Sequence, residues 1–153
     1  MEYEVTKYIT KLDKLFKMAE DIDDDDELQA HMARYLCIRT SGLIEVYMKS
    51  QINAYCSRSC PKEVVKFVNS HFKTFTNIDT DKLTKFFERF STDWLEKFND
   101  GMTEEMSSHL NAVISNRNNI AHGHNDSISL IPMQKYYTSV KNVINLLDTI
   151  IKH

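Results

Sequence analysis

The sequence predicts an all-α fold, and three features of its composition and pattern support this prediction. It has only 3 glycines and 2 prolines in 153 residues, too few for the many tight turns of an all-β protein. It is 42% hydrophobic, enough for one domain with a sizeable core. Its apolar residues recur three and four positions apart, which is the spacing of a helix face. We therefore expect a single helical domain over residues 1–153.

The N-terminal part is predicted to hold a helix over residues 3–20 and then the longest helix of the chain. The acidic run 21–27 between them favours a turn and the start of the next helix, where negative charge stabilises the helix dipole. A calcium loop is the alternative, but the run lacks the glycine and the ligand spacing of an EF-hand. From about residue 27 to 56 nothing interrupts a spine helix roughly 40 Å long. Gly42 within it predicts close approach by a neighbouring helix.

The middle of the chain predicts short connecting helices. Pro61 suits the first turn of a helix over residues 62–71. A polar linker, 74–79, separates it from a helix over 81–90, and another short helix follows over 91–98. These helices are rich in apolar and aromatic residues, so we expect them to be packing elements.

The C-terminal part predicts two longer helices. Thr103 is placed to cap the first, because acidic residues follow it in the first turn. That helix runs to about Ala121, with an apolar stripe at Met106, Leu110, Val113, Ile114 and Ile120. Gly123 ends it, since glycine tolerates the left-handed conformation found at helix ends. Pro132 opens the last helix, whose apolar face extends to Ile151.

Charge and cysteine usage favour an intracellular protein. Three cysteines is an odd number, which suits reduced thiols in a cytoplasm. The N-terminus is charged and has no apolar signal segment, and no run reaches the ~18 apolar residues of a membrane span. The net charge is −3, but residues 31–75 carry seven basic residues against two acidic ones. This basic middle permits a transient polyanionic substrate.

Arg117 and His122 draw attention because they stand where the apolar stripe ends. Arg117 falls in line with Val113 and Ala121, an unusual place for a guanidinium, because burying an unpaired charge is costly. In a continuous helix Arg117 and His122 would point about 140° apart. They can serve one site only if His122 swings on a loosened last turn, or if a second copy of the chain supplies the partner.

These residues resemble the motif of the HEPN family, in which arginine is followed by a polar residue and, four to six residues after the arginine, by histidine. Here the motif is Arg117-Asn118-Asn119-Ile120-Ala121-His122. The segments 25–47 and 113–130 are also similar to a compact bacterial branch of that family, whose members are regarded as toxin-like or phage-defence ribonucleases. The resemblance implies an all-α, HEPN-like helical bundle in which a homodimer cleaves RNA without a metal or cofactor.

The resemblance also implies roles for the residues. His122 would move protons at the 2′-hydroxyl or the leaving oxygen. Arg117 would stabilise negative charge on the phosphate, and Asn118 would orient the phosphate or the histidine. His124 is a further candidate for substrate contact. Expected products are a 2′,3′-cyclic phosphate and a 5′-hydroxyl, and an antitoxin or other regulatory partner is expected to restrain the enzyme.

Structural explanations exist for the same residues. His122 could instead cap the C-terminal end of the helix, and Arg117 could form a salt bridge with Glu45 or another acid inside the bundle. His122, His124 and Asp126, with or without Cys56 and Cys60, could bind a metal, although the cysteine spacing is unusual for zinc. The other histidines, His31 among them, have no acidic or cysteine partner at a telling spacing. Of the pair Tyr136 and Tyr137, which could stack on RNA bases, one is expected in the core.

The alternative function is a catalytically silent HEPN adaptor that binds a partner protein or a nucleotide. The negative net charge favours this alternative, whereas the presence of Arg117, Asn118 and His122 together favours the ribonuclease.

Overall fold

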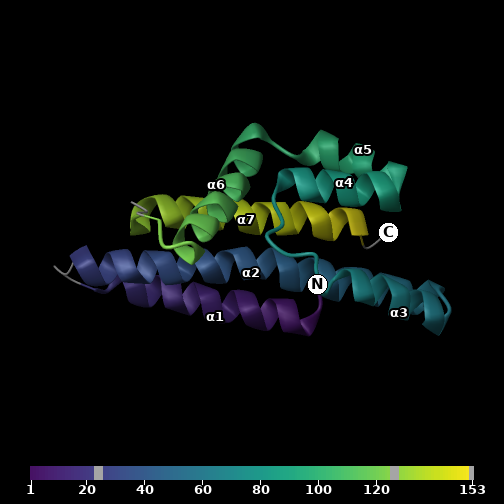
Figure 1. Cartoon of the computed structure of the whole chain (residues 1–153), viewed down its shortest axis with the longest axis horizontal. Coiled ribbons are helices and arrows are strands. Elements are labelled where there is room, and N and C mark those ends of the chain that lie inside the picture. Colours follow the sequence, from purple (N-terminus) through teal and green to yellow (C-terminus); the bar gives the residue numbers. More distant parts are fainter. Residues whose placement is uncertain (23–25, 125–127, 152–153) are drawn as a thin grey trace.

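The structure is a computed structural model that describes residues 1–22, 26–124 and 128–151. Within these ranges the chain forms helices and no strand, as predicted (Figure 1). The elements in order are α1 (Tyr3–Glu20), α2 (Asp26–Ser59), α3 (Lys62–His71), α4 (Thr80–Phe90), α5 (Thr92–Gly101), α6 (Glu104–Ala121) and α7 (Leu130–Ile151). No helix among the described residues has the length and apolar character that a membrane span requires.

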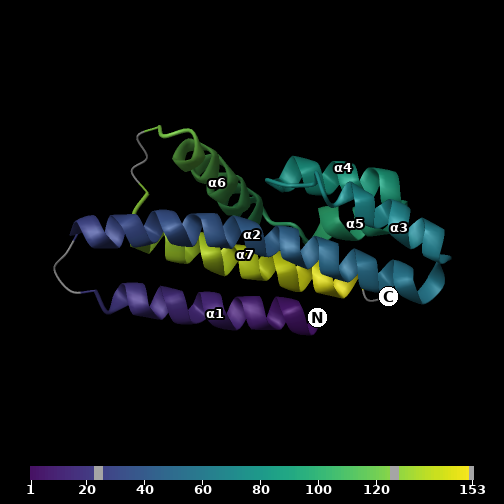
Figure 2. The same cartoon turned by 60° about the horizontal axis from the view of Figure 1, so that its bottom comes forward.

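Helix α2 is the spine of the fold. It has 34 residues, so it is about 50 Å long and slightly longer than the predicted segment 27–56. Helices α1 and α7 run alongside it (Figures 1 and 2). The core between these helices is filled by fully buried apolar side chains, among them Leu12, Leu36, Leu43, Ile44, Tyr47, Met48, Val140, Val143 and Leu147. Part of the acidic run, 23–25, lies outside the described residues.

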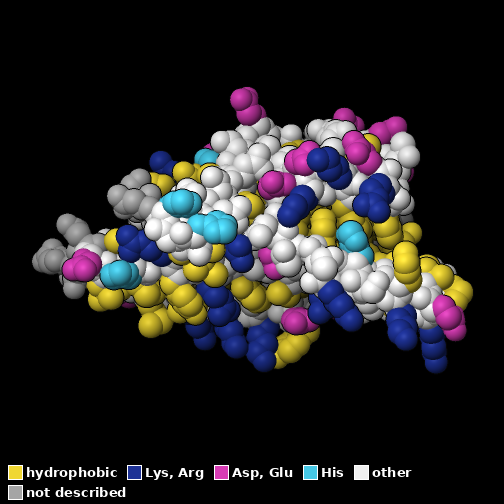
Figure 3. Space-filling view, in the orientation of Figure 1, with side chains coloured by type: hydrophobic (Ala, Val, Ile, Leu, Met, Phe, Trp, Pro, Cys, Tyr) yellow, Lys and Arg dark blue, Asp and Glu magenta, His cyan; other side chains and the backbone are white. Residues whose placement is uncertain are grey.

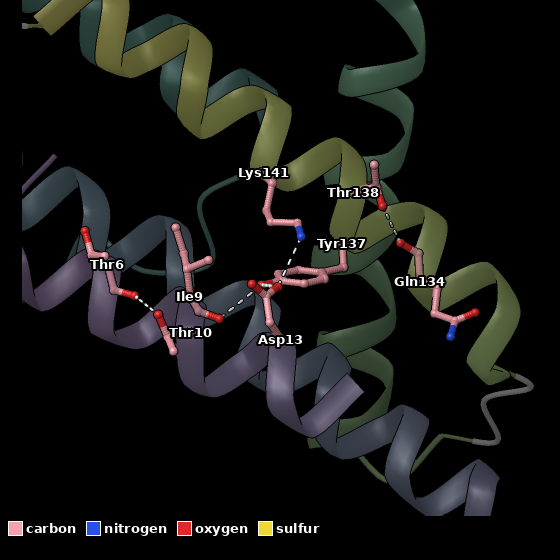
Figure 4. A network of polar contacts seen from close by, with 8 residues as sticks. All are labelled: Thr6, Ile9, Thr10, Asp13, Gln134, Tyr137, Thr138 and Lys141. Atoms are coloured by element: carbon pink, nitrogen blue, oxygen red, sulfur yellow. Dashed lines mark hydrogen bonds and ion pairs between the residues drawn. The ribbon is translucent and has the colours of Figure 1, made fainter. Parts of the chain in front are cut away.

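Tyr137 ties α7 to α1 (Figure 4). Its hydroxyl donates a 2.7 Å hydrogen bond to Asp13, whose carboxylate also pairs with Lys141 at 3.1 Å. The ring stacks on Phe16 with 4.4 Å between centroids. Burial and the Asp13 carboxylate raise the pKa of Tyr137 well above its ordinary value. Tyr137 is only 4% exposed, so it is the core member of the tyrosine pair, as expected.

At Gly42 a side chain of α1 lies against the backbone of α2. A Cβ built on Gly42 would lie 2.8 Å from the Tyr8 hydroxyl. That hydroxyl donates a 2.8 Å hydrogen bond to the carbonyl oxygen of Arg39 on α2. The close approach predicted from the glycine is therefore present, and its physical basis is a tyrosine lying across the α2 backbone.

The short helices α4 and α5 begin at side-chain caps. Asp79 accepts a hydrogen bond from the Lys82 backbone N–H at 2.9 Å, and Ser91 accepts one from that of Trp94 at 3.3 Å. Helices α4 and α5 bury aromatic side chains, including Phe87 and Phe98. Helix α3 differs, because none of its residues is buried. The expectation that the short helices are packing elements therefore holds only in part for α3, because Val65 and Val68 pack against the core while Val64 and Phe67 are exposed.

Candidate active site at the end of helix α6

Helix α6 is anchored in the core through its middle. The Thr103 hydroxyl accepts a hydrogen bond from the Met106 backbone N–H at 3.1 Å, so the predicted cap is present. Leu110, Val113 and Ile114 are buried. The buried Cys37 thiol on α2 donates a 3.4 Å hydrogen bond to the Val113 carbonyl. This contact holds α6 against the N-terminal half of α2 one turn before Arg117.

The last turn of α6 ends in the manner predicted from Gly123. Gly123 has φ +68°, in the left-handed region. Its N–H donates to the Ile120 carbonyl at 3.2 Å, and the His124 N–H donates to the Asn119 carbonyl at 2.9 Å. These two bonds form a Schellman motif, which satisfies carbonyls that would otherwise lack partners at the helix end. The positions of His122 and His124 are thereby defined by backbone hydrogen bonds.

The end of α6 emerges from the core instead of continuing its buried stripe. Arg117, Asn118 and Ile120 are half-buried, whereas Ala121 and His122 are exposed. Arg117 Nη1 lies 3.4 Å from Asn118 Oδ1. The predicted stripe is therefore buried only at Leu110, Val113 and Ile114, whereas Met106 and Ile120 are partly buried and pack against the edge of the core. A half-buried guanidinium keeps contact with water, which lowers the cost of leaving its charge unpaired.

The salt bridge considered between Arg117 and Glu45 does not form. Glu45 Oε1 instead accepts a 2.8 Å hydrogen bond from the Asn77 backbone N–H, in the segment between α3 and α4. Asn77 has a positive φ of 52°, so this bond stabilises an unusual turn. Within residues 1–22, 26–124 and 128–151, no carboxylate forms an ion pair with Arg117.

One chain does not bring Arg117 and His122 together. The His122 backbone N–H still donates a helical hydrogen bond to the Asn118 carbonyl at 3.0 Å, so the side chain leaves the helix about 140° from Arg117. In the described part of the chain no hydrogen bond joins the two side chains. His122 does occupy the C-cap position. Its imidazole makes no hydrogen bond among the described residues, which leaves it available for a ligand.

Other imidazoles gather around the end of α6. The rings of His122 and His124 are 6.2 Å apart between centroids, and both residues are exposed. Histidine, lysine and arginine side chains lie together over the end of α6 and the N-terminal half of α2 (Figure 3). His31 and Arg34 on that part of α2 are in contact, with Arg34 Nη1 3.2 Å from His31 Nδ1.

The view that His31 lacks an acidic partner is wrong. Its Nε2 lies 3.9 Å from Glu27, one helical turn earlier. Glu27 and His31 are four residues apart in the sequence, and this spacing places two side chains next to each other on a helix. It is the signal that would have placed His31 beside a carboxylate.

The metal site considered for this region can include neither Cys56 nor Cys60. Cys37, next to Val113, lies 19 residues before Cys56 on the same straight helix, which separates them by about 28 Å along the axis. Cys56 and Cys60 therefore lie at the opposite end of α2 from the last turn of α6. Asp126 lies outside the described residues, and no cluster of three potential ligands occurs within the described ranges.

A comparison with protein families decides the identity of the fold. The family model described as RiboL-PSP-HEPN matches residues 3–153. The chain belongs to the HEPN family. Comparisons with curated proteins and with solved structures gave no match. The match extends over all the helices of this HEPN domain from α1 to α7, so the predicted family and all-α fold are both confirmed.

Proposed function

We propose that this HEPN domain is a metal-independent RNA endonuclease whose reacting groups are Arg117, Asn118 and His122. The observation that carries the proposal is the end of α6. There the helix carries a half-buried arginine that no described carboxylate neutralises and an exposed histidine at a cap held by backbone hydrogen bonds. Structural residues are normally paired or buried, whereas groups that act on a ligand must be accessible and held in place.

The chemistry needs only these residue types. RNA carries its own nucleophile, the 2′-hydroxyl, which attacks the adjacent phosphorus and displaces the 5′-oxygen. The His122 imidazole accepts the proton of the 2′-hydroxyl or donates one to the leaving oxygen, which is the usual role of histidine in general acid–base catalysis. The Arg117 guanidinium donates hydrogen bonds to the phosphate oxygens as negative charge develops there. The products are a 2′,3′-cyclic phosphate and a 5′-hydroxyl.

Asn118 and His124 have supporting roles in this proposal. The side-chain oxygen Oδ1 of Asn118 accepts a 3.4 Å hydrogen bond from Arg117 Nη1 and can fix the direction of the guanidinium. The His124 imidazole, 6.2 Å from that of His122, is placed to contact an RNA phosphate beside the scissile one.

A homodimer supplies the geometry that one chain lacks. Two copies of α6 facing each other would place the Arg117 of one chain near the His122 of the other, despite the 140° between them within a chain. The N-terminal half of α2 carries exposed apolar side chains at Leu28, Tyr35 and Ile38, each more than 40% exposed. These positions fall within about 80° around the helix. An exposed apolar stripe of this kind fits a protein interface, but Cys37, which contacts Val113 of α6, points about 100° or more away from these positions, so the stripe lies on a different side of α2 from α6.

The biological role proposed is that of a toxin or phage-defence nuclease. An enzyme that cleaves cellular RNA would harm its own cell, so a neutralising antitoxin or regulatory protein is expected as a partner. The second candidate function is a silent adaptor, which the net charge of −3 favours because a basic surface promotes RNA binding.

The test is RNA cleavage by purified variants in the presence of EDTA. We expect Arg117→Ala and His122→Ala each to lower the rate by roughly 10²–10⁴-fold, with unchanged circular dichroism. Arg58→Ala is the matched control, because Arg58 is exposed at the far end of α2. This variant should cleave RNA like the wild type. An absence of cleavage by the wild type on any RNA supports the adaptor instead.

A further inference from the structure

Helix α3 presents an uncovered apolar face. Val64 is 43% exposed and Phe67 is 78% exposed, and they lie one turn apart on the same side of the helix. None of the residues of α3 is buried. Among the described residues, a single side-chain hydrogen bond joins α3 to α2: Asn69 Nδ2 donates to Asn53 Oδ1 at 2.7 Å.

The uncovered face borders a groove between α3 and α4. The groove has a volume of about 540 Å³, within the usual range of ligand sites. Its walls are largely aromatic and are formed by Phe67, His71, Phe75, Phe86 and Phe90. The space-filling view shows a hollow with a hydrophobic floor and an imidazole at its edge (Figure 3). The rings of His71 and Phe75 are 5.0 Å apart, and those of Phe86 and Phe90 are 5.2 Å apart.

Cations form one rim of this groove. Lys82, Lys85 and Arg89 follow each other at spacings of three and four on α4, so they form a row about 10 Å long on one side of the helix. Lys85 pairs with Asp81 at 2.7 Å, but both side chains are about two-thirds exposed, and such pairs are weak. No aspartate or glutamate is among the described residues that line the groove.

We propose that this groove binds unpaired bases of single-stranded RNA, in addition to the site at the end of α6. The exposed rings of Phe67 and His71 can accept base faces by stacking, and the row of cations follows the phosphates, which is the combination that recognises single strands. Double-stranded RNA keeps its bases paired and would not enter. The proposal takes RNA as the ligand from the proposed function.

The lining distinguishes this ligand from a peptide helix. Grooves that bind amphipathic helices take aliphatic and aromatic anchors in a series of apolar pockets. Here the described lining contains no leucine, isoleucine or methionine and only one valine, Val68. Flat rings beside a row of cations fit a base and its phosphate better than a leucine-rich helix.

The groove and the end of α6 lie at opposite ends of α2 (Figure 1). An RNA strand held by both would be anchored at a distance from the cleaved bond. The groove would therefore set the affinity for longer single strands, and it would contribute little to the rate once the substrate is bound.

The experiment measures binding separately from cleavage. A fluorescently labelled oligouridylate is titrated by anisotropy into His122→Ala protein, which holds RNA without cutting it. We expect the further substitutions Phe67→Ala and Arg89→Ala each to weaken binding about ten-fold. Both residues are exposed, so the fold should be preserved. Met18→Ala and Lys14→Ala, exposed on α1, are the matched controls and should leave the affinity unchanged.

Each result has a defined meaning. Unchanged affinity in both groove variants would overturn the proposal. Equal losses with duplex RNA of the same length would also overturn it, because stacking requires unpaired bases. Binding of an acidic helical peptide that depends on Phe67, with no effect of Phe67→Ala on RNA, would assign the groove to a protein partner. If the wild-type protein never cleaves RNA but the groove variants still weaken RNA binding, the proposed RNA-binding groove stands and only the proposed nuclease activity is refuted.

Discussion

The backbone N–H of His124 donates a 2.9 Å hydrogen bond to the carbonyl oxygen of Asn119, and this bond turns the chain sharply away from α6. It requires the left-handed backbone of Gly123 between His122 and His124. The two imidazoles at the candidate site therefore depend on a residue that carries no functional group of its own.

Replacing Gly123 tests this dependence. No atom lies within 4 Å of a Cβ built on Gly123, so Gly123→Ala should cost only the backbone strain of about 1 kcal/mol in the free energy of unfolding. Asparagine tolerates the left-handed region, so Gly123→Asn is the control and should cost less. Urea unfolding measures both. Equal stability of the alanine variant and the wild type would show that the turn is not under this constraint.

Gly42→Ala should have opposite effects in two backgrounds. In the wild type the new methyl group meets the Tyr8 hydroxyl at 2.8 Å, so we expect destabilisation by about 1–3 kcal/mol. In a Tyr8→Phe protein that oxygen is absent and the nearest ring carbon is 3.8 Å away. There the better helix propensity of alanine should stabilise the protein by up to about 1 kcal/mol.

The double-mutant cycle is read from urea unfolding of the four proteins. The same effect of Gly42→Ala in both backgrounds would refute the assignment of Tyr8 as the reason for the glycine.

Stability should fall at alkaline pH because of two buried tyrosines. Burial and then the Asp148 carboxylate raise the pKa of Tyr47, and burial and then Asp13 raise that of Tyr137. The unfolded chain loses these protons near pH 10 while the folded chain keeps them. The stabilisation is thus complete below pH 10 and is lost as pH rises above it, by up to about 1.4 kcal/mol per pH unit for each tyrosine.

Chemical unfolding at a series of pH values between 8 and about 11.5 measures this slope. Tyr137→Phe should reduce it, whereas Tyr3→Phe should not, because Tyr3 is 80% exposed. An unchanged slope in Tyr137→Phe would contradict the role given to its buried hydroxyl.

A mixed dimer tests whether two chains share the site. Arg117→Ala and His122→Ala proteins are each expected to be inactive. When they are co-expressed with different tags and isolated together, the mixed dimer retains one arginine and one histidine. We expect it to recover measurable cleavage above that of either parent. The control is a mixture of two differently tagged His122→Ala chains, which should stay inactive. If a verified mixed dimer shows no recovery, then cleavage requires Arg117 and His122 from the same chain, or both residues in both chains.

Much of this fold was predictable because local signals determine it. Gly42 and Gly123 were interpreted correctly, since a glycine within a helix and a glycine after one each have few physical explanations. Thr103 was placed correctly because capping depends on residues close in sequence. The same holds for the spine helix, whose length follows from an unbroken run of helix-forming residues.

Other features depend on contacts between distant segments. From the sequence alone, Glu45 could have formed a salt bridge with Arg117. In the structure its carboxylate instead accepts a hydrogen bond from the Asn77 backbone N–H. The apolar residues of α3 predicted a packing element, yet the sequence could not show that no other described helix covers Val64 and Phe67. Likewise the stripe of α6 continued in sequence to Ile120, but only the structure shows that this residue is partly buried at the edge of the core.

The most direct test of the nuclease account is the analysis of product ends after incubation of RNA with the purified protein in EDTA. The account predicts cleavage that yields 2′,3′-cyclic phosphate and 5′-hydroxyl ends, that is blocked by a single 2′-deoxy substitution at the cleaved position, and that is absent in His122→Ala. Cleavage that requires a divalent cation, or that persists at the deoxy position or in His122→Ala, would contradict it.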